Sequence, residues 1–292
     1  MNTKSFASVL AILGLGAVLA GCGSSTPTAS KTPNDLWAQV QKTHVITMAE
    51  TSYPPEDFQD PTTQQWTGFD VDVLQGFAKS IGAKMQFTSL PLASAIQAVE
   101  NHQQDITIDI YWTKQRAQVI SFSRPMFDWV DVVGVNSQHP TIKAATVADM
   151  TGKSLGVVIG SEEVQEAQKV PQATVKQFNT LDEALAALSS GRIDGLIVPD
   201  TDIPQSKALN PSLQIKTLGS VPASISPPLA SIRGYFGVPK GSYSTRFLQH
   251  LNSYIKKIEC NGQEQQMLAK YGMTSTVYLQ GLCSASNVYK GF

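Results

Sequence analysis

Arg116 is the residue of this sequence whose type and position most clearly suggest chemistry. It lies in a stretch that reads DITIDIYWTKQRAQVISFSRP, from Asp105 to Pro125. Isoleucines alternate with polar residues at 106–111 and predict a strand, and the chain then breaks into a short polar turn that carries Arg116. A guanidinium held just beyond a strand end can grip a carboxylate through two parallel hydrogen bonds. The alternative is a surface arginine on a short helix.

Two units of alternating strands and helices surround this stretch. The first unit begins with a strand at 45–49 and continues through helices near 69–81 and 93–99 to the strand at 105. The second unit begins with a strand at 129–135 and ends with a strand at 195–198, which Asp200 follows. Asp70 and Ser161 are the expected N-caps of one helix in each unit. The β-α-β-α-β order predicts α/β lobes, each with a mainly parallel sheet covered by helices.

The end of the chain is mostly helical, with one strand at 232–238 and helices at 245–258 and 263–271. We expect these helices to pack on the first unit, so that two crossing strands, near 128–135 and 234–238, act as hinges between the lobes. Lobe 1 then comprises residues 34–131 and 234–292, and lobe 2 comprises residues 132–233. Ligands of open α/β sheets bind at the carboxyl ends of the strands, so the Arg116 and Asp200 loops should face one cleft.

The composition limits the classes of partner. The chain has 292 residues, 42% of them hydrophobic and 15% charged, with a formal net charge of −1. This length suffices for two domains of ordinary size. No basic stripe indicates nucleic acid as a partner. The four histidines are scattered and no metal-ligand spacing is present, so we expect neither a metal nor another cofactor.

The N-terminus has the pattern of an export signal. Lys4 precedes an apolar stretch at 6–20, which is too short to span a bilayer comfortably. Small residues before Cys22 resemble the bacterial lipobox, in which cleavage precedes the cysteine and its sulfur takes a lipid. We expect a signal peptide at 1–21 and a mature, diacylated and palmitoylated lipoprotein anchored to the cell membrane through Cys22. The alternative is a plain signal peptide with an incidental cysteine.

A tether and a cysteine pair complete the export pattern. Residues 22–33 are rich in Ser, Thr and Pro and predict a flexible tether. In an oxidising extracytoplasmic compartment, Cys260 and Cys283 most simply form one disulfide. That bond would contribute roughly 3 kcal/mol in the chain-entropy model. Two free thiols are the alternative.

Short motifs spread over nearly all of the mature chain resemble the bacterial extracellular solute-binding proteins of family 3, which serve polar amino-acid ABC importers. In chain order, the motifs are Tyr53-Pro54-Pro55, Gly68-Phe69-Asp70-Val71-Asp72-Val73, Asp105-Ile106, Thr113-Lys114-Gln115-Arg116, Ile120-Ser121-Phe122-Ser123-Arg124-Pro125, Gly152-Lys153-Ser154-Leu155-Gly156-Val157, Gly191-Arg192-Ile193-Asp194, Asn261-Gly262 and Lys270-Tyr271-Gly272. The resemblance implies a two-lobed, type II-like periplasmic-binding-protein fold that closes on a small solute by hinge motion.

The resemblance also implies which residues contact the solute. Arg116 falls where family members hold the ligand α-carboxylate, and Asp200 falls near the acid that holds the α-amino group. Tyr53 falls where an aromatic ring packs on the ligand side chain, and Glu50 where some binders of basic amino acids place an acid. The full expected set is Glu50, Tyr53, Asp109, Tyr111, Thr113, Arg116, Ser161, Glu162 and Asp200.

Several of these positions depart from the family pattern. Asp109 and Tyr111 stand where small or hydroxyl residues are usual, and Glu162 replaces a threonine. Pro199 stands where the amino-group acid is expected, one residue before Asp200. Glu162 either turns away from a ligand carboxylate or meets a different group of the ligand. A role for Asp109 and Glu162 as solvated residues on the rim of the cleft is also open.

Four acids around one arginine favour a ligand that carries positive charge, because buried carboxylates need cationic partners. Tyr53, Tyr111 and Trp112 could add cation–π contacts. We therefore expect a monomeric extracytoplasmic receptor, not an enzyme, that captures a zwitterionic or cationic amino-acid-like solute and delivers it to the permease subunits of an ABC importer. The compartment is the periplasm if the host has two membranes. The alternative is an enzyme on the same fold, similar to cyclohexadienyl dehydratase, with Glu162 or Asp109 as general acid.

Overall fold

The computed structural model describes residues 35–226, 233–273, 276–279 and 281–284. These residues belong to one compact unit that begins at Pro33. The predicted signal peptide and the whole predicted tether, Cys22 included, lie outside the described residues. Over the described ranges, no helix has both the length and the apolar character needed to cross a membrane.

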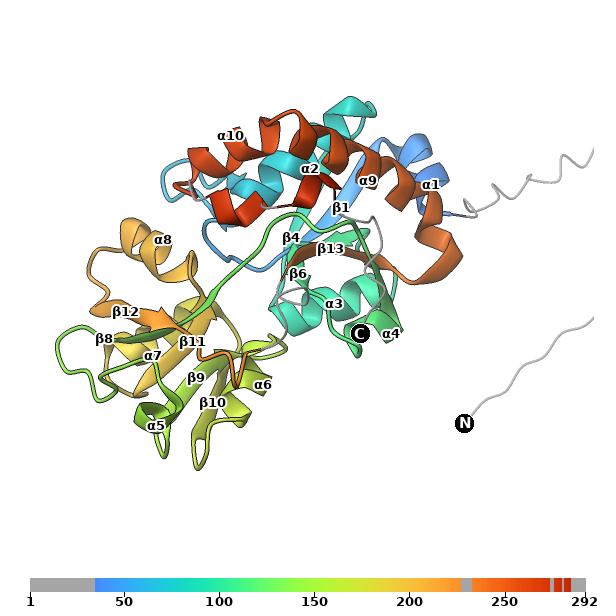
Figure 1. The fold of residues 1–292 in the computed structure, drawn as a ribbon. Coiled ribbons are helices and arrows are strands. Elements are labelled where there is room, and N and C mark those ends of the chain that lie inside the picture. The colour runs from blue at the N-terminus through green and yellow to red at the C-terminus, as the bar shows by residue number, and fades with distance from the viewer. Residues whose placement is uncertain (1–34, 227–232, 274–275, 280, 285–292) are drawn as a thin grey trace, which may run out of the picture. The chain divides into compact units, whose positions relative to one another are not determined.

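A three-stranded parallel sheet forms the core of the first lobe. Its central strand β1 (Val45–Glu50) pairs with β4 (Lys84–Ser89) on one side and with β5 (Ile106–Thr107) on the other. The crossovers contain α2 (Phe69–Ser80) and α3 (Leu92–Glu100), which are the two helices expected here (Figure 1). A two-stranded hairpin that we did not predict, β2 (Phe58–Gln59) and β3 (Trp66–Thr67), precedes α2.

The expected cap of α2 is wrong. The N-cap position is Gly68, at φ 131°, and no side chain caps this helix end. The amides of Phe69 and Asp70 are already bound by the carbonyl oxygens of Pro55 and Glu56. The Asp70 carboxylate therefore does not cap the N-terminus of α2, although it lies buried in the first turn of this helix.

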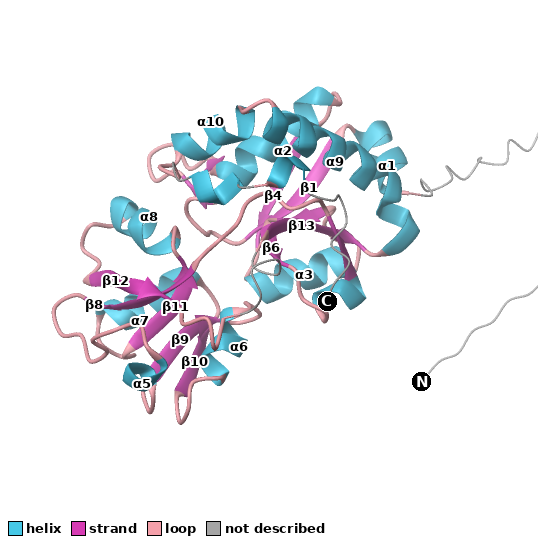
Figure 2. Cartoon of the chain, viewed as in Figure 1, coloured by secondary structure: helices cyan, strands magenta, loops and turns pink. Residues whose placement is uncertain are grey.

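The second lobe contains a five-stranded sheet of mixed direction. The strand order is β10 (Thr174–Phe178), β9 (Ser154–Val158), β11 (Gly195–Pro199), β8 (Asp131–Asn136) and β12 (Ile215–Ser220). The first three strands are mutually parallel, and β8 is antiparallel to both of its neighbours. Figure 2 shows the helices that accompany this sheet, which are α5 (Val147–Met150), α6 (Glu163–Gln168), α7 (Leu181–Ser189) and α8 (Asp202–Leu209).

Two helices of this lobe differ in how their N-termini are capped, and the expected cap at Ser161 is wrong. Thr180 caps α7, since its side chain accepts a hydrogen bond from the Glu183 amide. Ser161 does not cap α6, because the N-cap position falls one residue later, at Glu162. The helix α8 and the strand β12 were not predicted, because neither has a clear apolar period.

A small antiparallel sheet positions Arg116. The strand β13 (Gly234–Pro239) pairs with β6 (Asp109–Tyr111) and with β7 (Ile120–Phe122), and the short helix α4 (Arg116–Val119) connects these two. The two connections between the lobes run antiparallel where Asp128 bridges Arg233. These features, with the two larger sheets, give the expected two-lobed α/β fold. The exact lobe boundaries given above remain a prediction.

The C-terminal helices pack on the first lobe, as expected. The helices α9 (Thr245–Cys260) and α10 (Gln263–Lys270) contact α2, and α9 also contacts α1 (Leu36–Thr43), which we did not predict. A disulfide joins Cys260 to Cys283 and so ties α9 to the last described turns. The short 3-10 helices are η2 (Gly241–Ser244), η3 (Thr276–Leu279) and η4 (Leu282–Ser284).

Candidate functional site

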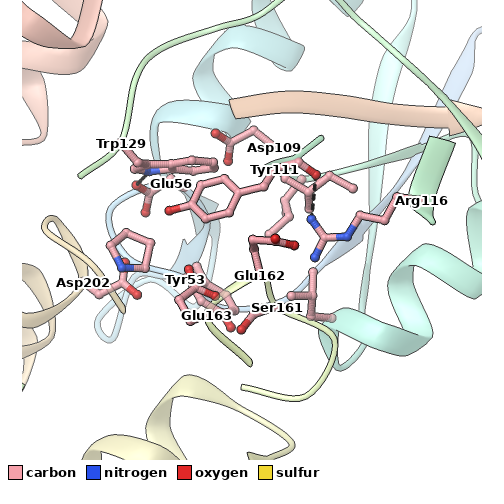
Figure 3. A pocket seen from close by; sticks show the side chains of 14 residues that line it. Tyr53, Glu56, Asp109, Tyr111, Arg116, Trp129, Ser161, Glu162, Glu163 and Asp202 are labelled. Atoms are coloured by element: carbon pink, nitrogen blue, oxygen red, sulfur yellow. Dashed lines mark hydrogen bonds between the residues drawn. The ribbon is translucent and has the colours of Figure 1, made fainter. Parts of the chain in front are cut away.

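One pocket receives side chains from elements of both lobes. It has about 430 Å³ of atom-free space, part of which is open to solvent. Figure 3 shows its polar lining, with Arg116 on one side and with Glu56 and Asp202 on the other. The residues that line it are Tyr53, Glu56, Leu92, Ile108, Asp109, Ile110, Tyr111, Arg116, Trp129, Ser161, Glu162, Glu163, Pro199 and Asp202.

Arg116 contacts both lobes through its guanidinium. Nη1 donates to the Tyr111 carbonyl oxygen at 2.7 Å, and Nη2 donates to the Gly160 carbonyl oxygen at 2.5 Å. Burial lowers the pKa of Arg116, while the nearby Glu163 and Glu162 act in the opposite direction. A surface arginine, the alternative above, is excluded because Arg116 is only 8% exposed. The remaining guanidinium N–H groups are available to an anionic group in the pocket.

Tyr111 and Trp129 form an aromatic wall. Their rings meet edge to face, with centroids 4.6 Å apart, and Phe127 packs behind Trp129. The Tyr111 hydroxyl donates to Oδ1 of Asp131, through a short hydrogen bond. Burial, and then the neighbouring Glu163 and Glu166, raise the pKa of Asp131 well above its usual value. Because Tyr111 is fixed by Asp131, its ring is a rigid part of the wall.

Asp109 lies buried at the base of the pocket. It is 2% exposed, so it is not a solvated rim residue. Its amide donates to Oδ2 of Asp70 at 2.7 Å, and burial, followed by the charge of Asp70, raises the pKa of Asp109 well above the usual range. Gly234 faces it on β13, where a Cβ atom would lie 2.2 Å from Oδ2 of Asp109. A glycine at 234 is therefore required by the position of this carboxyl group.

Glu56 and Asp202 are acids of the pocket that we did not predict. Oε1 of Glu56 accepts hydrogen bonds from Nε1 of Trp129 and from Oγ1 of Thr201. Burial is the main cause that raises the pKa of Glu56 to about 8 and the pKa of Asp202 well above its usual value. An acid directly after the Tyr53-Pro54-Pro55 motif is the one sequence signal that could have indicated Glu56.

Six of the predicted ligand residues line the pocket together: Tyr53, Asp109, Tyr111, Arg116, Ser161 and Glu162. Glu162 thus faces the pocket and does not turn away. It also accepts a hydrogen bond from Gln165, and burial raises its pKa while Arg116 opposes the rise. Glu163, which we did not predict, lies beside it and is 5% exposed.

The other three predicted residues lie outside the pocket lining. Glu50 is fully buried next to Asp57, and burial together with Asp57 raises the pKa of Glu50 to about 12. Thr113 accepts a hydrogen bond from the Arg116 amide at 3.0 Å, so it holds the turn in which Arg116 lies. Oδ2 of Asp200 accepts a hydrogen bond from the Tyr278 hydroxyl at 3.2 Å, and its neighbours Pro199 and Asp202 face the pocket instead.

Comparison with known proteins agrees with this architecture. The family model of the bacterial extracellular solute-binding proteins, family 3, matches residues 45–274. The L-cystine-binding protein TcyA of Bacillus subtilis (strain 168) is 28% identical over 182 residues, which cover 61% of this chain and 67% of that protein.

Two solved structures extend the comparison. An ancestral arginine-binding protein bound to arginine superposes with a TM-score of 0.68 and 25% identity, covering 78% of this chain and 98% of that one. An ancestral amino acid-binding protein, a precursor of cyclohexadienyl dehydratase, superposes with a TM-score of 0.67 over 81% of this chain and 99% of that one. Its identity of 22% supports a shared fold alone.

Proposed function

We propose that this chain, which belongs to the bacterial extracellular solute-binding proteins of family 3, binds an amino-acid-like solute, zwitterionic or cationic, and delivers it to an ABC importer. One observation carries the proposal: a single guanidinium, that of Arg116, shares a largely buried pocket with five carboxyl side chains. Arg116 supplies N–H donors to a ligand carboxylate, and the acids balance the ligand's positive charge. The arginine-bound relative supports a ligand of this type.

A ligand panel tests the proposal. The mature chain is titrated with the common amino acids and with polyamines by isothermal calorimetry, after any bound ligand has been removed by unfolding and refolding. We expect the tightest binding among amino acids with neutral polar or cationic side chains. Binding of glutamate or aspartate without binding of lysine, arginine or glutamine would contradict the proposal, because the pocket would then add negative charge to buried acids.

The alternative reaction class has one observation in its favour. A dehydratase-like enzyme needs a carboxyl group that stays protonated at neutral pH, and the raised pKa of Asp109 meets that need. The two functions differ in what they do to the ligand. A receptor releases its solute unchanged, so mass spectrometry of the ligand after prolonged incubation decides between them. A dehydrated product that disappears in Asp109→Asn would favour the enzyme.

We also propose that Cys22 carries the lipid that anchors the receptor. Replacement by Ser would remove the sulfur to which the lipid is attached. Mass spectrometry of the mature wild-type chain should therefore find a lipid on Cys22 that the Cys22→Ser protein lacks. A mature wild-type chain whose Cys22 carries no lipid would contradict a lipid anchor at this residue.

A further inference from the structure

Glu56 points a carboxyl oxygen into the pocket without a hydrogen-bond partner. Oε1 is held by the Trp129 indole at 3.3 Å and by the Thr201 hydroxyl at 3.0 Å. Oε2 accepts no hydrogen bond from any described residue, and Glu56 is 2% exposed. A buried carboxyl oxygen without a partner is costly, so this oxygen calls for a donor that enters through the pocket.

Asp202 presents a second oxygen of the same kind. The residue is fully buried and lines the pocket, and within the described chain its Oδ2 has no hydrogen-bond partner. Its Oδ1 lies 3.4 Å from the Thr201 hydroxyl that also contacts Glu56. A hydroxyl has a single proton, and the shorter contact directs it to Glu56, so Asp202 receives little from Thr201.

The two carboxyl groups and the Trp129 indole define what we call the Glu56–Asp202 recess. Figure 3 shows Glu56, Trp129 and Asp202 on one side of the pocket, apart from Arg116. The acids that most affect the charge of Arg116 are instead Glu163 and Glu162. The recess therefore lies apart from the guanidinium, and Glu163 is the acid that acts on both Arg116 and Asp202.

This separation decides which group of an amino acid the recess can take. The α-amino and α-carboxylate groups are attached to the same carbon atom. With the carboxylate at Arg116, the α-amino group lies close to it, on the side of Glu163 and Glu162, the acids that most affect Arg116. A group that reaches the recess has to come from the far end of the ligand side chain.

We propose that the Glu56–Asp202 recess binds a terminal ammonium or guanidinium group of the ligand side chain, so that the preferred solute is a cationic amino acid. The inference rests on the proposed function and adds the substrate class to it. Two acceptor oxygens suit a group with several N–H donors, and the Trp129 ring adds an aromatic surface next to the cation. Glu50, the acid expected for this task, lies next to Asp57 and outside the pocket lining.

The test uses matched ligand pairs on the mature, refolded chain in isothermal calorimetry. L-Lysine is compared with L-norleucine, which lacks the terminal ammonium, and L-arginine with L-citrulline, its neutral analogue. The wild-type chain should bind a cationic member at least about 10-fold more tightly than its neutral partner, a factor that corresponds to about 1.4 kcal/mol. Glu56→Gln and Asp202→Asn should each reduce this ratio to below about 3-fold.

Glu100→Gln is the matched control, because it removes an acid from the exposed end of α3 without touching the pocket. It should leave the ratio unchanged, which shows that the general negative charge of the protein is not the cause. Far-UV circular dichroism and cooperative thermal unfolding establish that each variant is folded. If one pocket variant does not fold, the other variant decides the test.

The outcomes separate the two proposals. Equal affinity of the wild-type chain for both members of each pair overturns this inference and leaves the proposed function intact. A preference for the cation that persists in both pocket variants also overturns it. Failure of the wild-type chain to bind any amino acid overturns the proposed function and this inference together.

Discussion

At the scale of single residues, Arg116 combines two tasks. Its guanidinium joins the carbonyl oxygens of Tyr111 and Gly160, which belong to different lobes, and it also faces the pocket. In the proposed function, this one side chain would link ligand binding to closure of the lobes. The adjacent Glu163 and Glu162 oppose the lowering of the Arg116 pKa that burial causes.

Replacement of Arg116 by Ala should weaken amino-acid binding by at least about 30-fold, because truncating one partner of a buried charged pair costs about 2–5 kcal/mol. Arg246→Ala is the matched control, since Arg246 forms an exposed ion pair with Asp35 and neither residue lines the pocket. Calorimetric titration of both variants with the best ligand measures the effect. Equal affinity of Arg116→Ala and Arg246→Ala would remove Arg116 from the site.

At the scale of elements, the turn after β1 is organised by Asp57. Its carboxylate accepts hydrogen bonds from the amides of Thr51, Ser52 and Tyr53, and it is fully buried. Tyr53 therefore reaches the pocket from a turn that is fixed by a side chain four residues later. Glu50 completes this arrangement as the neutral partner of Asp57.

Asp57→Ala should destabilise the protein by about 2–4 kcal/mol, because several buried backbone N–H groups lose their acceptor. It should also weaken ligand binding, since Tyr53 loses its fixed position. Asp60→Ala provides the control: Asp60 accepts hydrogen bonds from Thr62 and Thr63 in the same way, but in an exposed turn. Urea unfolding should show a much smaller loss for Asp60→Ala. Equal losses in the two variants would contradict the role assigned to Asp57.

The disulfide joins α9 to the last turns, and those turns contact the connection between the lobes. The Tyr278 carbonyl oxygen accepts a hydrogen bond from the Asp128 amide, and its hydroxyl donates to Asp200. Cys260 and Cys283 are 23 residues apart, so the double replacement by Ser should cost roughly 3 kcal/mol. Urea unfolding of the oxidised, reduced and double-Ser proteins measures this. An oxidised protein no more stable than the double-Ser variant would contradict the prediction.

At the scale of the whole molecule, the buried acids determine how stability depends on pH. Burial raises the pKa of Glu56 and of Glu166 to about 8 and that of Asp70 to about 7, and charged neighbours add to the effect. A carboxyl group with a raised pKa binds more protons in the folded state than in the unfolded state. The stability of the ligand-free protein therefore falls as the pH rises from the ordinary carboxyl pKa toward 8.

We expect the ligand-free chain to be less stable at pH 8 than at pH 5 by at least about 1 kcal/mol. This is the free energy that corresponds to a shift of one unit in the pKa of one group. Thermal unfolding at constant ionic strength measures the difference. Glu166→Gln should reduce it, because one of the responsible groups is then uncharged in both states. A chain that is more stable at pH 8 would show that these acids are ionised in the folded state.

The sequence by itself determined the fold and part of the site. Apolar periodicity and turn residues are local signals, and they predicted the α/β units and the final helices. The polar turn after β6 likewise placed Arg116 at a strand end. Motif order then indicated the family, and the family model agrees over residues 45–274.

Only the tertiary structure decided which acids face the pocket. Glu50 precedes the pocket turn in sequence, yet it pairs with Asp57, whereas Glu56 lines the pocket. After Pro199, Asp202 lines the pocket, whereas Asp200 accepts a hydrogen bond from the Tyr278 hydroxyl. The direction of a polar side chain depends on which distant loop supplies its partner, and no local pattern in the sequence records that choice.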